Sequence, residues 1–307
     1  MADAGAVPGL TTNVALKEKP RVTVFVRSSK GGSLAASPMA HQILMVIGIK
    51  VDCGVIPESK LTITHVDDSR PMPSSLRSHG ISRVPAVVIG DTGEDDPETI
   101  ISLLDRHYPG GLDFPLQEEK NISDDNDSPP SCEKNEDTPE MASRDFFSRF
   151  SFCVRGITDS SEHLDVALHR LNSFLLKKQS QSYHDDQPSP WICGSKLPSL
   201  LDCEVLPKLH HVRVAGAAGL AGQWMVAEWS IPGAWPGIWC YLHSAYSMPA
   251  FIRSCPSDKE IILHWADRAG ANNLPAGVKD KIAKLESDDI PKISWFVPAR
   301  ADMVFLD

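Results

Sequence analysis

Hydrophobic and polar positions in the first third of the chain follow the patterns of strands and helices. Arg21 to Arg27 and Leu61 to Val66 are rich in β-branched residues, and the second run alternates like a half-buried strand. Ala86 to Ile89 is a short apolar run that is typical of a buried strand. Met39 to Ile49 and Glu98 to His107 have helical spacing. The pattern therefore predicts the order βαβ, then a further strand and a helix.

This order of elements indicates a thioredoxin-like α/β domain, which we assign to residues 20–109. Gly90-Asp91-Thr92-Gly93 supplies a turn after the third strand. Residues 1–19 lack both a basic segment and a sustained apolar run, so we expect a flexible leader and no secretory signal.

Helical patterns follow one another in the second half of the chain, where strand patterns stop. Four leucines recur at i, i+4, i+7 and i+11: Leu164, Leu168, Leu171 and Leu175. The expected helices comprise an aromatic-rich one at 144–154, a leucine-rich one capped by 159–162, one near 238–246, and one capped by 257–260 that ends near 268. Seven Trp residues, concentrated between 224 and 239, indicate core and inter-domain packing, and an aromatic belt at a membrane is the alternative. We therefore predict an all-helical domain at 144–269 and a tail at 270–307.

The helix expected at Ser199 to Val214 has a distinctive start. Ser199 and Asp202 form the short version of a capping box, in which each side chain accepts a hydrogen bond from the other residue's backbone N–H. Apolar residues after the cap supply a helical face. Pro207 removes a backbone donor inside the helix, and we expect a kink there. His210 and His211 are adjacent, so they point to different faces and do not form a metal-chelating pair; we expect them to be partly buried.

Charge along the chain separates the two halves. Nine Asp or Glu and two Lys lie between Gln117 and Met141, so this segment holds −7 of the net charge of −10. Its composition is that of a solvated, disordered segment, and we assign residues 110–143 to an acidic insert or linker. A docking tail for a basic partner is the alternative. The rest of the chain has no basic patch, which argues against nucleic-acid binding.

Cysteine usage indicates a reducing environment. The seven Cys residues include no C-x-x-C pair and no Cys/His spacing typical of zinc ligands. An odd number without such spacings favours neither a disulfide framework nor a metal site. We therefore expect a cytoplasmic location and no bound metal.

Two motifs resemble the chloride intracellular channel (CLIC) family of invertebrates. They are LLDCEVLPKLHHVRV at 200–214 and WCYLHSAYSMPAFIRSCPSDKEIILHW at 239–265. The resemblance implies an α+β, glutathione-transferase-like fold, with a thioredoxin-like amino-terminal domain and an all-helical carboxy-terminal domain. It also implies a protein that is monomeric when soluble, associates reversibly with membranes and forms an anion channel. The implied partners are the lipid bilayer, chloride and cytoskeletal or signalling proteins.

The resemblance also places a degenerate glutathione site. The family has a Cys followed by Pro where the first helix begins, and Ser37 and Pro38 stand there in this chain. Val84 and Pro85 match the family's cis-proline step, where the backbone pairs with glutathione. Asp96 matches the acidic residue that contacts the γ-glutamyl end, but Pro97 replaces the hydroxyl residue that follows it. Because a serine cannot form a mixed disulfide, we expect no thiol oxidoreductase activity and no required cofactor, with glutathione as a weak ligand.

The segment from Leu34 to Pro57 matches the family's proposed membrane-inserting region. It is long enough to cross a bilayer as a helix of ~20 residues. Lys50 and Asp52 would each cost up to about 3 kcal/mol at the bilayer centre, which roughly cancels the apolar gain. We interpret the segment as the buried first helix and following loop of a folded domain.

Three functions fit the sequence. The first is a CLIC-like channel former, or a non-catalytic binding module, with no catalytic residue. The second is a glutathione transferase in which the Ser37 hydroxyl activates the glutathione thiol. The third is an interaction subunit that uses an inactive transferase fold. Capture on immobilised glutathione with a conjugation assay, and chloride efflux from liposomes, distinguish them.

Overall fold

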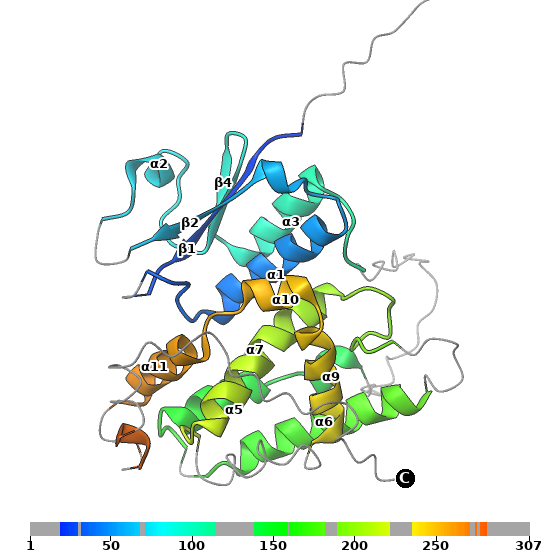
Figure 1. Cartoon of the computed structure of the whole chain (residues 1–307). Helices are drawn as coiled ribbons and strands as arrows, with labels where there is room; N and C mark the ends of the chain where they lie inside the picture. Colours follow the sequence, from blue (N-terminus) through cyan, green and yellow to red (C-terminus); the bar gives the residue numbers. More distant parts are fainter. Residues whose placement is uncertain are drawn as a thin grey trace, which may run out of the picture.

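A small mixed sheet with two helices lies above a set of helices that pack against one another (Figure 1). The computed structural model describes residues 19–29, 32–67, 71–113, 138–158, 160–181, 189–221, 235–270, 274 and 277–280. Residues 1–18 of the leader and the central part of the acidic insert lie outside the described residues, as do Asp159, Trp224, Trp229 and most of the tail.

The sheet has the strand order β2-β1-β3-β4. Its strands are β1 (Val22–Arg27), β2 (Leu61–Val66), β3 (Ala86–Ile89) and β4 (Thr92–Glu94). β2 runs parallel to β1, while β3 is antiparallel to β1 and β4 is antiparallel to β3. The three predicted strands are confirmed. The turn prediction missed β4, because the chain reverses within Gly90 and Asp91 and pairs again from Thr92 onward.

Two longer helices accompany the sheet: α1 (Pro38–Asp52) and α3 (Pro97–His107). A short 3-10 turn (Glu58–Lys60) precedes β2, and α2 (Ser74–Arg77) follows it. Most of the side chains of α1 are buried, including Ile43, Met45 and Ile47. The segment after Leu34 is therefore the buried first helix of a folded domain here, as the sequence indicates.

The described residues from 138 to 270 contain helices and no strand longer than an isolated bridge. They are α4 (Pro139–Ala142), α5 (Phe146–Val154), α6 (Glu162–Gln181), α7 (Leu200–Ala217), α9 (Pro236–Tyr246), α10 (Pro249–Ser254) and α11 (Asp258–Ala269). The four leucines predicted for the core of α6 are at most 2% exposed. The short helix α4 lies within the range that we assigned to the acidic insert.

Helix α7 lies at the centre of the helical unit (Figure 1). Its first turn has the predicted capping box between Ser199 and Asp202, and the helix continues through Pro207. The sequence predicts one apolar face, but residues on all sides of α7 are buried. His210 and His211 are fully buried rather than partly buried, because α1, α10 and α11 cover the polar positions of the helix as well.

Helix α1 packs between the sheet and the helical unit. A Cβ atom at Gly48 would lie 3.1 Å from the Cβ of Ala250, so glycine allows α10 to approach α1 closely. Asp52, near the end of α1, pairs with Arg253 of α10. These contacts fix the position of α1 relative to the helical domain.

Lys50 is fully buried near the carboxyl end of α1. Its ammonium donates to the carbonyls of Tyr108 and Gly110, each at 2.7 Å, and lies 3.2 Å from the carboxylate of Asp105. A buried charge is stable when such groups surround it. Lys50 therefore joins α1 to the end of α3 and to the segment that follows α3.

Asp202 holds the start of α7 to two other segments. Its side chain is fully buried and accepts hydrogen bonds from the backbone N–H of Ile192 at 2.9 Å and from the hydroxyl of Tyr241 at 2.6 Å. It also accepts from the backbone N–H and the hydroxyl of Ser199, at 2.8 and 2.6 Å. Burial next to Asp202 raises the pKa of Tyr241 well above its usual range, so the phenol stays a donor.

Replacing Asp202 with asparagine should lower the free energy of unfolding by about 3 kcal/mol. The amide NH₂ of asparagine does not accept hydrogen bonds. Buried donors that now pair with the Asp202 carboxylate would therefore lose an acceptor. Urea unfolding followed by circular dichroism measures the change. Glu204→Gln is the matched control, because Glu204 lies on the same helix and pairs with Lys208 on the surface. Equal losses in both variants would contradict the role assigned to Asp202.

Candidate functional site

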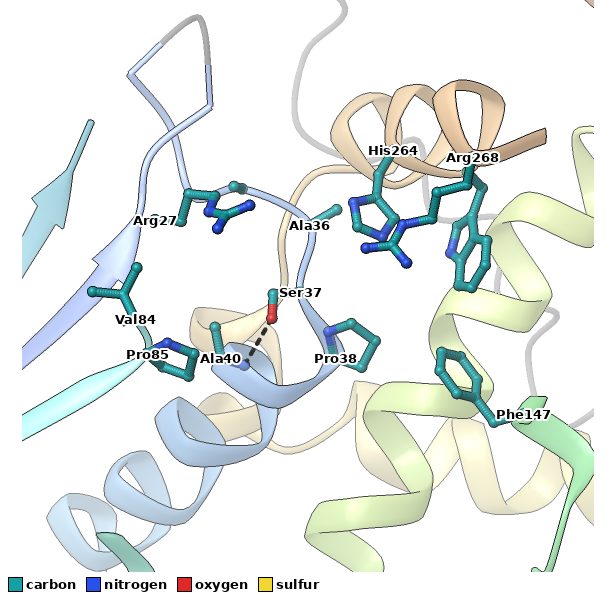
Figure 2. A pocket seen from close by; sticks show the side chains of 12 residues that line it. Arg27, Ala36, Ser37, Pro38, Ala40, Val84, Pro85, Phe147, His264 and Arg268 are labelled. Atoms are coloured by element: carbon teal, nitrogen blue, oxygen red, sulfur yellow. Dashed lines mark hydrogen bonds between the residues drawn. The ribbon is translucent and has the colours of Figure 1, made fainter. Parts of the chain in front are cut away.

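A cavity of about 290 Å³ lies where the amino end of α1 faces α11 (Figure 2). Its lining includes four of the five residues that the sequence assigned to a degenerate glutathione site: Ser37, Pro38, Val84 and Pro85. They come from two places that are distant in the sequence, the start of α1 and the loop before β3. The thioredoxin-like topology brings these two places together.

Ser37 is the N-cap of α1. Its Oγ accepts a hydrogen bond from the backbone N–H of Ala40 at 3.3 Å, and Pro38 follows in the first turn, where a missing N–H costs nothing. Figure 2 shows the hydroxyl above the first turn, between Ala36 and Ala40. The amino end of a 15-residue helix carries partial positive charge, so the cavity side of Ser37 favours negative charge.

The Val84-Pro85 peptide bond is cis, as the sequence predicts. Both residues lie on the opposite side of the cavity from α11 (Figure 2). Asp96 is not part of the cavity lining. Its carboxylate instead caps α3, accepting from the backbone N–H of Thr99 at 3.2 Å, and lies 3.4 Å from Arg83.

The site predicted from the sequence does not include the residues that line the rest of the cavity. They are Arg27 at the end of β1, Phe147 of α5, and His264, Trp265 and Arg268 of α11, together with Ala35, Ala36 and Ala40. A signal for two of them was present, because the four-residue spacing of His264 and Arg268 puts both on one face of a helix. The sequence does not show that this face points to the start of α1.

His264 is neutral in this environment. Burial lowers the pKa of its imidazole from 6.5 to about 4, and the neighbouring guanidinium groups of Arg268 and Arg27 act in the same direction, while Asp267 acts against them. The guanidinium of Arg268 lies 5.7 Å from the centre of the Trp265 ring, a distance typical of a cation–π contact. The cavity wall formed by α11 is therefore both aromatic and cationic.

A cysteine–histidine contact lies away from the cavity lining. The Sγ of Cys255 is 3.5 Å from the Nε2 of His41. Burial raises the pKa of the Cys255 thiol well above its usual range and lowers the pKa of His41 to about 3. Both groups are therefore neutral, which makes Cys255 a poor nucleophile. Within the described ranges, no cluster of three His, Cys, Asp or Glu could hold a metal ion.

Comparisons with known proteins give the same family as the sequence motifs. No family model matches the chain. The chain is 28% identical over 147 residues to the chloride intracellular channel exl-1 of Caenorhabditis elegans, a match that covers 48% of this chain and 55% of that protein. It is 34% identical over 83 residues to chloride intracellular channel exc-4 of the same organism, which covers 27% of this chain and 26% of that protein. The chain thus spans about half of one relative and about a quarter of the other.

Solved structures share the fold. The crystal structure of the CLIC homologue EXC-4 from C. elegans superposes with a TM-score of 0.55 at 19% identity, over 87% of this chain and 98% of that chain. A glutathione transferase Omega 2C from Trametes versicolor gives 0.54 at 13% identity, over 82% and 100%. A dehydroascorbate reductase from Chlamydomonas reinhardtii gives 0.52 at 17% identity, over 80% and 98%.

These findings give the fold of the chain and its homologues. Its sheet order, its helical second unit and its structural neighbours define a glutathione-transferase fold, with a thioredoxin-like domain followed by a helical one. Within this fold, its curated homologues are CLIC proteins, so the resemblance to the CLIC family is confirmed.

Ser37→Ala should lower the free energy of unfolding by about 1 kcal/mol, because the first turn of α1 loses its N-cap acceptor. Thermal or urea unfolding measures this loss. Ser37→Asp is the matched variant, since a carboxylate also accepts from the first turn and suits the positive end of the helix. If the alanine and aspartate variants were equally destabilised, the capping role of Ser37 would be excluded.

Proposed function

We propose that this chain is a CLIC-like protein whose cavity binds a peptide ligand without thiol chemistry. The observation that supports this is the oxygen of Ser37 at the amino end of α1, on the cavity wall. A cysteine at such a position is activated because the helix end stabilises its thiolate. A serine hydroxyl has no comparable acidity and forms no disulfide.

Glutathione is the ligand that suits this cavity in our proposal. The backbone beside the cis bond of Val84 and Pro85 would pair with an extended peptide, as the resemblance to the CLIC family implies, and the Ser37 hydroxyl lies across the cavity wall from it. Asp96 takes no part, since its carboxylate caps α3 and Pro97 has no N–H to offer. Fewer contacts than in a complete site agree with weak binding and with no required cofactor.

Ser37→Cys should create a mixed disulfide with oxidised glutathione that the parent protein does not form at this position. The experiment uses the full chain in a Cys53→Ser background, because Cys53 is exposed and would react independently. Peptide mass spectrometry locates the modified residue. No adduct at position 37 in the cysteine variant would show that the cavity does not take glutathione in this orientation.

A serine-type glutathione transferase is the second candidate, because the Ser37 hydroxyl lines the cavity and could hydrogen-bond a glutathione thiolate. Conjugation of a chlorinated nitrobenzene that disappears in Ser37→Ala but not in Arg106→Gln would favour it. Arg106 is an exposed residue of α3 outside the cavity lining, so its variant reports general effects of mutation.

A location in the cytoplasm with reversible association at the membrane surface is a further part of the proposal. It is supported by the names of the curated relatives, which are chloride intracellular channels. Cytoskeletal or signalling proteins would be its partners at that surface. Among the helices of the described residues, none has the length and apolar character needed to cross a membrane.

Channel formation would require α1 to leave its place in the fold. Its apolar side chains are buried against the sheet, α7 and α10, and its Lys50 is held by the carbonyls of Tyr108 and Gly110. A membrane-inserted state would therefore need the thioredoxin-like domain to open. The same lysine opposes insertion, since a central charge costs up to about 3 kcal/mol in a bilayer.

Lys50→Met should therefore increase chloride efflux from liposomes if α1 is the inserting segment. The substitution removes the buried contacts that hold α1 and also the charge that opposes insertion. Lys196→Met, which changes an exposed lysine in a loop, is the control and should leave efflux unchanged. Equal efflux from the parent protein and both variants would contradict insertion through α1.

A further inference from the structure

Basic side chains from both domains converge on the cavity of an acidic protein. The chain has a net charge of −10, yet the described residues that line the cavity include Arg27, His264 and Arg268 and no Asp or Glu. Local positive charge in a concave site concentrates anions even when the whole protein is acidic. The charge of this cavity therefore indicates the charge of its ligand.

The basic groups lie on two sides of Ser37. Figure 2 shows Arg27 on the side of the sheet, while His264 and Arg268 project from α11 on the other side. The two α11 residues are four apart and share a helix face. Trp265 lies beside the guanidinium of Arg268 and limits its movement. A ligand group above the amino end of α1 would thus meet cationic side chains from both walls.

Ser37 adds a hydrogen-bond donor to this arrangement. Its Oγ accepts from Ala40, so the hydroxyl hydrogen can be donated toward the cavity. Arg268 offers a planar set of N–H donors, which matches groups with several acceptor oxygens. Donors of this kind, next to the positive end of α1, suit an oxyanion better than a neutral thiol.

We propose that this cavity binds an oxyanion group between Arg27 and the His264–Arg268 face of α11, and that its ligand is a glutathione-like peptide with a sulfonate at the sulfur position. The inference rests on the proposed function, because it takes this cavity to be the peptide site. Free sulfate is a tetrahedral oxyanion as well and could occupy the same place. The experiment therefore has to distinguish a sulfonate on a peptide from free sulfate.

Binding of such a group should be coupled to protonation of His264. The groups that face this imidazole are Arg268 and Asp267 on α11, Arg27 on β1 and the neutral His211 on α7. An anion would offset the two guanidinium charges, and the pKa of His264 would rise from about 4 toward its ordinary value. The bound state then holds more protons than the free state between these two pKa values. Affinity should therefore increase as the pH falls through this range.

The experiment is isothermal titration calorimetry of the full chain with three probes: reduced glutathione, glutathione sulfonate and inorganic sulfate. At about pH 5, where the linked proton is taken up, we expect the sulfonate to bind at least about tenfold more tightly than glutathione. Arg268→Gln should reduce this preference to near one, and Arg106→Gln should preserve it. His264→Gln should remove the proton uptake, which is measured by repeating the titration in buffers of different ionisation enthalpy.

The outcomes separate this inference from the proposed function. If glutathione binds and the sulfonate binds no more tightly, the oxyanion inference is wrong and the peptide site stands. If neither peptide binds, both are wrong. Sulfate that binds as tightly as the sulfonate peptide would overturn the peptide part. A preference that survives in Arg268→Gln would overturn the site assigned to the α11 face.

Discussion

The carboxylate of Asp202 is the interaction on which the position of the cavity depends. It accepts hydrogen bonds from Ile192, Ser199 and Tyr241, and so joins the loop before α7, the cap of α7 and the middle of α9. A carboxylate buried without donors would be very costly, so the donors from these three segments stabilise this arrangement. Helix α7 is held at the centre of the helical unit, and α1 packs against it. The location of Ser37 is thus set in part by a carboxylate in the other domain.

The two ends of α1 have different structural roles. At its carboxyl end, Lys50 is held by the carbonyls of Tyr108 and Gly110. Gly111 follows with a φ of 89°, and a Cβ atom at this position would lie 3.2 Å from the Cγ of Lys50. At its amino end, Ser37 caps the first turn on the cavity wall. Because the buried end is fixed by many contacts, the cavity end is held in place without needing ligand contacts of its own. This arrangement leaves the surface around Ser37 open to vary in chemistry.

The sequence could predict the elements whose signals are local. β-branched runs identified the first three strands, and the leucine repeat identified the core of α6. It missed β4, because Thr92-Gly93-Glu94 contains no apolar residue. It also predicted a single apolar face for α7 and only partial burial of His210 and His211, because polar residues of a helix are expected outside its apolar face. Their burial depends on α1, α10 and α11, which come from other parts of the chain.

The residues of the candidate site were also only partly predictable from the sequence. The resemblance to the CLIC family placed Ser37, Pro38, Val84 and Pro85 in one site, and the structure puts all four on the cavity wall, with Ser37 as a helix cap and Val84-Pro85 as a cis bond. Asp96 also has a local role, as the cap of α3, and that role takes it away from the cavity lining. The basic residues could not be found in this way, since their place in the cavity follows from the docking of α11 and not from any local pattern.

The charges around the cavity determine what a serine at position 37 can do. Burial keeps His41, His210 and His211 neutral, so the field at the cavity comes mainly from Arg27, from Arg268 and from the amino end of α1. In a site with a cysteine, such a field stabilises the thiolate of the protein. A serine hydroxyl does not ionise, so the same field has no protein anion to stabilise. It would then act on the charge of a bound ligand, which is the physical basis of the oxyanion site that we propose for this cavity.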